Sequence, residues 1–259
     1  MSDLGINDGT AVRIVTDGLV ARIQLNRPRV LNAFNHGLRE SLVAAIHAVH
    51  ADEAVRVVVI EGEGRAFSAG QDQKEAATMD AAGAQRRMNA YSALFAGIRQ
   101  LEKPLIAKIR GHAAGAGLQL ALLSDLRIAG ASAQLGMTEL KVGSVPMMGS
   151  AVLKILAGDA VMKRMVLMAD FIPAAQALSY NLLHEVVPDD VLDARVDEIT
   201  ARLAAYSPVS MRLTKQWWRT LSDDVFERLD RESHKAHAEN FAAGGMSDGA
   251  RAFLKSKGG

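Results

Sequence analysis

The sequence predicts an α/β protein built around a mostly parallel β-sheet. Three apolar runs, Val55–Ile60, Leu105–Ile109 and Leu126–Ala129, are separated by longer segments of helical character. Continuous apolar runs of this length are typical of strands that are buried on both faces, as in parallel sheets. Strands that alternate with helices favour βα units, in which each helix returns the chain to the start of the next strand.

The first 50 residues predict a hairpin followed by a helix. Residues Ala11–Val15 and Leu19–Leu25 alternate between apolar and polar positions, and Asp17-Gly18 supplies a tight turn between them. Asn26-Arg27-Pro28 ends the second strand, because proline fixes φ and has no backbone N–H to donate. Apolar residues then recur at helical spacing over about residues 36–50.

Beyond about Met147 the pattern is almost entirely helical, with Glu185–Pro188 as a short exception. Asp189-Asp190 precedes a helix that we expect over Val191–Ala205, because acidic side chains there cap free N–H groups and favour the positive helix end. Ser207-Pro208 begins the next helix in the same way, with proline in its first turn.

Composition excludes several classes of protein. The 259 residues include 30 Lys+Arg and 29 Asp+Glu, a formal net charge of +1, whereas a nucleic-acid-binding protein would show a basic excess or stripe. The absence of cysteine excludes disulfides, thiolate metal sites and a cysteine nucleophile. The seven histidines lack metal-ligand spacing, so we expect no metal. No apolar run is long enough to cross a membrane and the N-terminus lacks a signal-peptide pattern, so we expect a cytoplasmic protein without a membrane partner.

Two glycine-rich segments follow directly on predicted buried strands. Gly62–Lys74 follows the strand ending at Ile60, and Arg110–Leu120 follows the strand ending at Ile109. The second segment opens an apolar helix, whose first N–H groups would suit an anion or an oxygen that becomes negative during a reaction. An ordinary loop and close helix–strand packing also account for such glycines. Neither segment matches a phosphate-binding loop or the dinucleotide fingerprint.

Ordered motifs along nearly the whole chain carry a family resemblance. They are Leu25–Ala33, Arg65–Lys74, Gly111–Gly117, Ser124–Ala129, Ser207–Lys215, Phe241 and Asp248–Lys255. Together, in this order and at this spacing, they resemble the motifs of the enoyl-CoA hydratase/isomerase (crotonase) superfamily. The ordered set is far more specific than any single motif. The resemblance implies an α/β crotonase (ClpP/crotonase-like) fold, a spiral of ββα units followed by a helical C-terminal region.

The resemblance also implies how a site would work. Members bind acyl-CoA thioesters and stabilise an enolate on the thioester oxygen with two backbone N–H groups, which map here onto Gln71 and Ala116. Ala116 stands where the family usually has glycine, but only its amide is needed. Positions flanking CoA map onto Arg29, Val30, Ala69, Asp72, Gln73 and Lys74, and the acyl pocket includes Met147 and Phe241. Coenzyme A is part of the substrate, so we expect no separate cofactor.

Three positions around the acyl chain distinguish the reactions of this superfamily. Hydratases carry two glutamates, of which the first is Gln119 here and the second is retained as Glu139. Dienoyl-CoA isomerases and aromatic dehalogenases place an aspartate at the third position, which is Met147 here. An amide cannot exchange protons near neutral pH, whereas one buried carboxylate can move a proton from C2 to C4. We therefore expect Δ3,Δ2-enoyl-CoA isomerase-like chemistry, with Glu139 and Gln119 as the catalytic residues.

Alternatives stay open at these positions. The chain could be an enoyl-CoA hydratase that uses Glu139 alone, or a non-catalytic acyl-CoA-binding paralogue that has lost one carboxylate. Glu139 could also be a helix-start carboxylate, and Gln119 a buried amide satisfied by backbone groups. We expect Asp125 and Arg127 to form a structural pair that supports the sheet.

The chain is expected to divide into a catalytic core, residues 1–200, and a helical oligomerisation region, residues 201–259. Trp217 and Trp218 belong to a set of apolar side chains in this region that exceeds what one domain needs to cover itself. The resemblance implies a homotrimer or a dimer of trimers, in which the helix around Phe241 closes a neighbour's acyl pocket.

Overall fold

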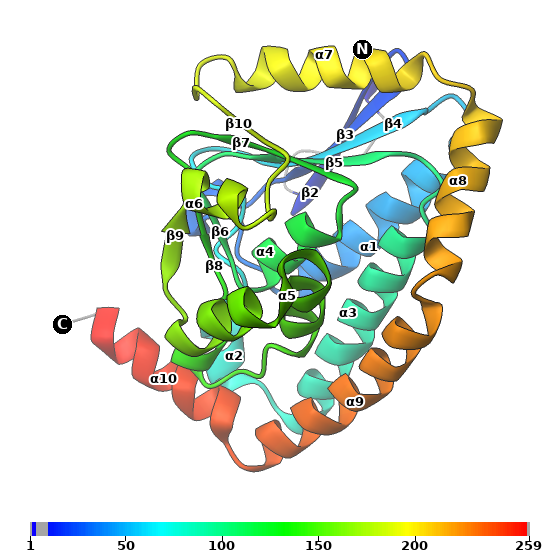
Figure 1. Cartoon of the computed structure of the whole chain (residues 1–259). Coiled ribbons are helices and arrows are strands. Elements are labelled where there is room, and N and C mark those ends of the chain that lie inside the picture. Colours follow the sequence, from blue (N-terminus) through cyan, green and yellow to red (C-terminus); the bar gives the residue numbers. More distant parts are fainter. Residues whose placement is uncertain (1, 4–9, 258–259) are drawn as a thin grey trace.

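A seven-stranded sheet forms the centre of the structure, a computed structural model that describes residues 2–3 and 10–257 (Figure 1). The strand order is β1-β2-β3-β4-β5-β7-β10. These strands are β1 (Ser2–Asp3), β2 (Val12–Asp17), β3 (Val20–Leu25), β4 (Val57–Gly62), β5 (Leu105–Ile109), β7 (Leu126–Gly130) and β10 (Glu185–Val187). The first three pair antiparallel and the others pair parallel, which confirms the α/β class and the mostly parallel sheet.

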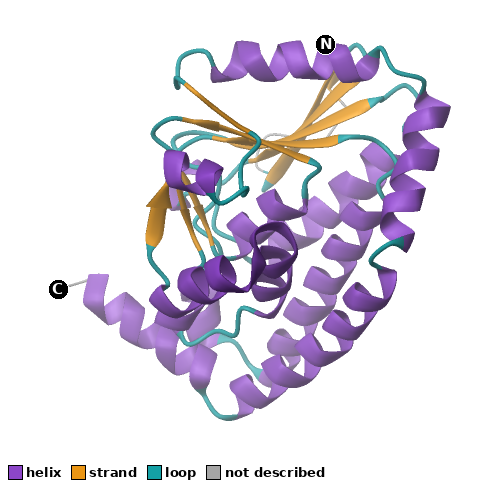
Figure 2. Cartoon of the chain, viewed as in Figure 1, coloured by secondary structure: helices purple, strands orange, loops and turns teal. Residues whose placement is uncertain are grey.

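Helices cover both faces of this sheet, as Figure 2 shows. On one face lie α1 (His36–Ala51), α3 (Ala81–Gln100) and α4 (Ala116–Leu123), and on the other lies α7 (Leu192–Ala204). Along β4 the side chains alternate, because Val58 and Ile60 belong to the first core and Val57 and Val59 to the second. This explains why the sequence of β4 reads as a continuous apolar run.

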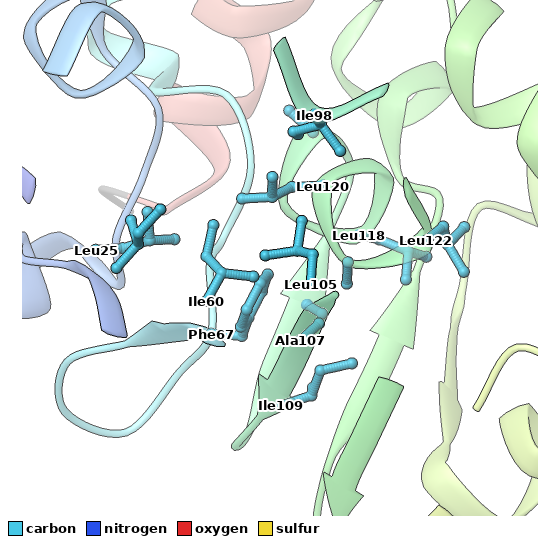
Figure 3. Close-up of a cluster of buried hydrophobic side chains, with 14 of the residues drawn as sticks. Leu25, Ile60, Phe67, Ile98, Leu105, Ala107, Ile109, Leu118, Leu120 and Leu122 are labelled. Atoms are coloured by element: carbon cyan, nitrogen blue, oxygen red, sulfur yellow. The ribbon is translucent and has the colours of Figure 1, made fainter. Parts of the chain in front are cut away.

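The larger core lies beneath the two glycine-rich segments. Figure 3 shows Ile60 and Phe67 close to Leu105, with Leu118 and Leu120 of α4 above them. All five side chains are buried. Truncating a large apolar side chain in such a core typically costs about 2–5 kcal/mol, so this packing fixes α4 firmly on the sheet.

A second, three-stranded sheet stands beside the first and contains β6 (His112–Ala114), β8 (Gln134–Gly136) and β9 (Phe171–Pro173). β8 pairs parallel with β6 and antiparallel with β9. The sequence did not predict these strands, because three residues are too few to show a period of two. Their position matters for function, since β6 leads directly into α4.

The remaining helices enclose the space below the sheets. They are α2 (Gln73–Thr78), α5 (Met147–Met168), α6 (Ala174–Ser179), α8 (Pro208–Thr220), α9 (Asp223–Ala242) and α10 (Gly245–Lys257), with short 3₁₀ helices η1 (Pro28–Val30) and η2 (Glu139–Val142). Helices α8 and α9 run along one side of the molecule, where α9 packs against α3, and α10 turns away from them to pack against α2 (Figure 1). Among residues 2–3 and 10–257, no helix is long and apolar enough to cross a membrane.

Most predicted elements match the structure closely. The hairpin is β2–β3, and the predicted 36–50 helix is α1, whose first turn is capped by Asn35 Oδ1 accepting from Leu38 N at 3.0 Å. The short non-helical segment predicted at Glu185–Pro188 is strand β10. Ser207 caps α8 and Pro208 occupies its first turn, as predicted.

The start of α7 differs from the prediction. The helix begins at Leu192 and its N-cap residue is Val191, not an aspartate. Asp189 turns back toward β7, where its Oδ1 accepts a hydrogen bond from Ser132 N at 3.3 Å. Gly130 leaves room for this carboxylate, since a Cβ there would lie 2.0 Å from Asp189 Oδ1.

Asp125 and Arg127 do not form the expected pair. Asp125 Oδ2 accepts from Leu105 N at 2.7 Å and from Lys215 Nζ at 2.5 Å, which ties α8 to the start of β5. Arg127 donates to the carbonyl oxygens of Ser124 and Leu182 at 2.6 and 2.7 Å. Backbone carbonyls can satisfy a buried guanidinium, so no carboxylate partner is required. Burial lowers the pKa of Arg127 to about 10.

Candidate active site

A cavity of about 970 Å³ opens where the two glycine-rich loops meet the helices below the sheets. Ten of the predicted site residues line it: Val30, Ala69, Gln71, Asp72, Gln73, Lys74, Ala116, Gln119, Glu139 and Met147. They come from segments far apart in sequence, which the fold brings together. The predicted positions Arg29 and Phe241 are not among its lining residues.

The first glycine-rich loop is held against the second by backbone contacts. Ser68 N donates to His112 O at 3.0 Å, and Ala114 N donates to Ser68 O at 2.9 Å. Gly70 has φ +80°, and a Cβ there would lie 2.6 Å from Ala114 O and 3.4 Å from Ala116 N. Glycine is therefore required at position 70 for its backbone to lie directly beside the start of α4.

The amides of Gln71 and Ala116 are free to bind a ligand. Within the described part of the chain, neither N–H donates to an acceptor, although the neighbouring amides of Gly70, Asp72 and Gly115 all do. Ala116 is the first residue of α4, where N–H groups have no partner within the helix. Two unpartnered N–H groups on adjoining loops, both facing one cavity, can stabilise an oxyanion.

Glu139 lies beside these amides at the start of η2 and is only 8 % exposed. A Cβ on Gly115 would lie 3.4 Å from Glu139 Oε1, so the carboxylate lies directly beside the residue that precedes Ala116. Burial raises the pKa of Glu139 to about 7, opposed by a hydrogen bond from its own backbone, by Gln119 and by the charge of Arg87. A carboxyl group with this pKa can both accept and release a proton near neutral pH.

Gln119 fixes the orientation of this carboxylate. It lies one turn after Ala116 on α4, and its Nε2 donates to Glu139 Oε1 at 2.6 Å. The Gln119 side chain thus binds the Glu139 carboxylate, whereas the alternative was an amide satisfied by backbone groups. Glu139 Oε2 is buried and has no hydrogen-bond partner among the described residues. One oxygen of the carboxylate is therefore held and the other is left for chemistry.

Comparison with known proteins now decides the family. The family model described as enoyl-CoA hydratase/isomerase matches residues 16–257. The chain belongs to the enoyl-CoA hydratase/isomerase family. It is 31 % identical over 239 residues to 2,3-dehydroadipyl-CoA hydratase of Escherichia coli strain K12, covering 92 % of this chain and 93 % of that protein.

Solved structures of the family share its fold. The crystal structure of an enoyl-CoA hydratase from Mycobacterium avium subsp. paratuberculosis K-10 superposes with a TM-score of 0.87 at 25 % identity, covering 95 % of this chain and all of that one. A putative enoyl-CoA hydratase from Thermobifida fusca YX, solved in complex with CoA, is 35 % identical with a TM-score of 0.74, covering 90 % of this chain and 95 % of that one. The crotonase fold inferred from the motifs is therefore confirmed.

The predicted CoA-flanking positions of this family member fall into two groups. Val30, Ala69, Gln73 and Lys74 line the cavity around η1 and the start of α2. Asp72 lines it too, but its carboxylate caps α2 by accepting from Lys74 N at 3.1 Å, and it pairs with Arg27 at 3.0 Å. Its first role in the structure is therefore to hold the loop in shape.

Several residues that line the cavity were not predicted from the sequence. Arg87 and Tyr91 of α3, Ser233 and His237 of α9, and Phe253 and Leu254 of α10 all line it. No motif marks the residues of α3 and α9, because these helices have an ordinary composition. Phe253 and Leu254 fall within the Asp248–Lys255 motif, but they were not predicted to line the site. Phe241 instead packs against Ala76, Met246 and Ala250 in a small separate core of the same chain.

Proposed function

We propose that this protein is an acyl-CoA enzyme that isomerises enoyl-CoA thioesters, with Glu139 as its only general acid/base. The Glu139–Gln119 pair is the observation that carries the proposal. Family members carry proton-transferring side chains at three positions. Here two of these positions hold side chains that cannot transfer a proton, the amide of Gln119 and the thioether of Met147. The remaining carboxylate, Glu139, has one buried oxygen beside two amides, and none of these three groups has a hydrogen-bond partner in the described part of the chain.

The chemistry follows from this arrangement. The thioester oxygen accepts from the N–H groups of Gln71 and Ala116, which stabilise the negative charge of the enolate. Removing one such donor typically costs about 10²–10³ in rate. Glu139, ionised, takes a proton from C4 or C2 and returns it to the other carbon, so the double bond moves while the carboxylate ends as it began. Gln119 holds Oε1 throughout and exchanges no proton.

The nucleotide end of the thioester is proposed to leave the cavity past η1 and α2. Lys74, exposed at the start of α2, offers a cation for the CoA phosphates at this mouth. The similarity to a protein solved in complex with CoA supports the proposal that this chain binds a CoA thioester. We retain Arg29, on the same exposed turn as Val30, as a proposed CoA contact outside the cavity.

Hydration by Glu139 alone is the second candidate. The printed names of the curated relatives favour it, since they include a 2,3-dehydroadipyl-CoA hydratase and a short-chain-enoyl-CoA hydratase. The side-chain oxygen of Gln119 could accept a hydrogen bond from a water, but it could not take the proton that this water must lose when it attacks the enoyl-CoA.

A substrate panel separates the candidates. Purified protein is assayed with matched 2-enoyl- and 3-enoyl-CoAs, and both isomerisation and hydration are followed for wild type and Gln119→Glu. We expect wild type to isomerise faster than it hydrates, and Gln119→Glu to raise hydration relative to isomerisation. Rapid hydration by wild type would favour the second candidate. Binding without turnover of any enoyl-CoA would favour a non-catalytic acyl-CoA-binding protein.

We also propose that the protein forms a homotrimer, alone or paired as a dimer of trimers. Apolar side chains recur every four residues along α8 at Val209, Leu213 and Trp217, and they continue to Leu221. All four are more than half exposed in the single chain. A stripe of this kind is typical of a surface that another protein covers. The division near residue 200 into core and oligomerisation region belongs to this proposal.

A further inference from the structure

One buried arginine that lines the cavity forms no ion pair with a described residue. Arg87 is 6 % exposed, yet among the described residues no carboxylate oxygen lies within 4.0 Å of its guanidinium. Its Nε donates to Gln71 Oε1 at 2.8 Å, its Nη1 contacts Met88 Sδ at 3.7 Å, and its guanidinium lies 5.1 Å from the centre of the Tyr91 ring. Buried charges are normally paired, so an arginine held this way requires an explanation.

The nearest acidic residue of the network is already engaged elsewhere. Glu75 accepts two hydrogen bonds from Arg39, at 2.9 and 3.0 Å, one from His36 N at 2.6 Å and one from Gln71 Nε2 at 2.9 Å. Arg87 reaches this carboxylate only through the Gln71 amide. Two buried arginines therefore share this carboxylate. Glu139 is the other carboxylate whose charge acts on Arg87, and no ion pair within 4.0 Å joins the two.

The open side of Arg87 faces the cavity. Its Nη2 donates to no acceptor among residues 2–3 and 10–257, and the protein does not enclose this atom completely. His237 lines the same cavity from α9. Burial, and then the charge of Arg87, lower the pKa of His237 to about 4. The imidazole is thus neutral near pH 7 and can offer a hydrogen bond without adding charge.

Much of the remaining cavity lining is apolar, although Ser92, Ser144 and Asp230 also belong to it. Its apolar residues include Met88 and Phe95 of α3 and Met147 and Met148 of α5. A ligand that fills this space would therefore combine an apolar chain with a negatively charged end group. Arg87 presents the planar donor geometry that a carboxylate prefers.

We propose that Arg87 binds a carboxylate at the end of the acyl group, so that the preferred substrates are enoyl-CoA thioesters of dicarboxylic acids. This rests on the proposed function only in taking the cavity as an acyl-CoA site. The carboxylate completes the hydrogen bonding of Arg87 and takes no part in the proton transfer at Glu139. Gln71 links the two ends of the site, because its backbone faces the thioester and its side chain orients Arg87.

The test compares binding of saturated CoA thioesters, which cannot react. Pairs of equal chain length, one ending in a carboxylate and one in a methyl group, are titrated into wild type, Arg87→Met, Arg87→Lys and the control Arg86→Met. Arg86 is the neighbouring residue on α3, and its side chain is largely exposed. We expect wild type and the control to prefer the carboxylate by about 30-fold or more at the best-fitting length, as for a desolvated charge pair. Arg87→Met should lose that preference, and Arg87→Lys should keep part of it.

The outcomes separate this inference from the proposed function. Equal affinity of wild type for the two members of every pair would overturn the role of Arg87. A loss in Arg87→Met that is the same for both members would also overturn it and indicate a structural role. Absence of turnover with every enoyl-CoA would count against the isomerase proposal and leave the binding preference standing. If Arg87→Met does not fold, the wild-type preference and Arg87→Lys decide the question.

Discussion

Replacing Gln119 by leucine should move the pH dependence of the reaction. The hydrogen bond from Gln119 Nε2 to Glu139 Oε1, 2.6 Å long and buried, favours the ionised carboxylate. A hydrogen bond to a charged group contributes about 1.5–3 kcal/mol, and one pKa unit corresponds to about 1.4 kcal/mol. Without the amide, the pKa of Glu139 should rise by about one to two units from its value of about 7.

The assay is kcat/KM as a function of pH, which reports groups of the free enzyme. Glu139 must be ionised to take a proton, so activity should fall as pH decreases through its pKa. This acidic limb should lie near pH 7 in wild type and at about pH 8–9 in Gln119→Leu, with activity recovering at higher pH. Gln216→Leu is a matched control, because Gln216 Nε2 donates to Glu102 Oε1 at 2.6 Å outside the cavity. An unmoved limb in Gln119→Leu would refute the assignment of Glu139 as the titrating base.

Three further predictions concern stability, the oxyanion hole and assembly. Glu139→Gln should raise the free energy of unfolding by about 3 kcal/mol at pH 8 and change it little at pH 4, because folding raises the pKa of Glu139 from 4.5 to about 7, so that ionisation opposes folding above pH 4.5. Chemical denaturation at both pH values measures this, and equal changes at the two pH values would contradict it. Ala116→Pro should fold, since proline is tolerated at the first helical position, but its kcat/KM should fall by at least about 10² because one donor of the oxyanion hole is lost. A folded variant with wild-type activity would show that the Ala116 amide is not part of the oxyanion hole. Leu213→Asp should convert a trimer to monomers in light scattering, whereas a monomeric wild type would contradict the proposed assembly.

Sequence reasoning works best where one physical signal dominates. The β-branched run of β4 and the Asp17-Gly18 turn of the β2–β3 hairpin each depend on local propensity and burial, and the structure places them within two residues of the prediction. Gly70 is needed where the two loops approach closely, because a Cβ there would lie 2.6 Å from Ala114 O. Gly115 has φ +49°, a backbone conformation that favours glycine. Family spacing alone predicts that Glu139 and Gln119 belong to one site, because two residues 20 positions apart carry no pairing signal of their own. The hydrogen bond between them was not predicted.

The remainder depends on tertiary contacts that leave no local trace. Three-residue strands such as β6 form only because neighbouring backbone presents matching hydrogen bonds. Arg127 finds carbonyl oxygens instead of the nearby Asp125, and nothing in a sequence distinguishes these two outcomes. In the sequence, nothing distinguishes Arg87 from the other charged residues of α3, a helix of mixed composition. Its burial becomes visible only once α9 is packed against α3.

The activity of Glu139→Gln tests the central claim most directly. The substitution keeps the size of the side chain and an oxygen for Gln119, but it removes the only proton-exchanging group in the proposed mechanism. We predict that isomerisation falls by at least about 10²–10⁴ while the dissociation constant for an acyl-CoA stays within a few-fold of wild type. A Glu139→Gln protein that isomerises or hydrates enoyl-CoA at near wild-type rates would contradict the account.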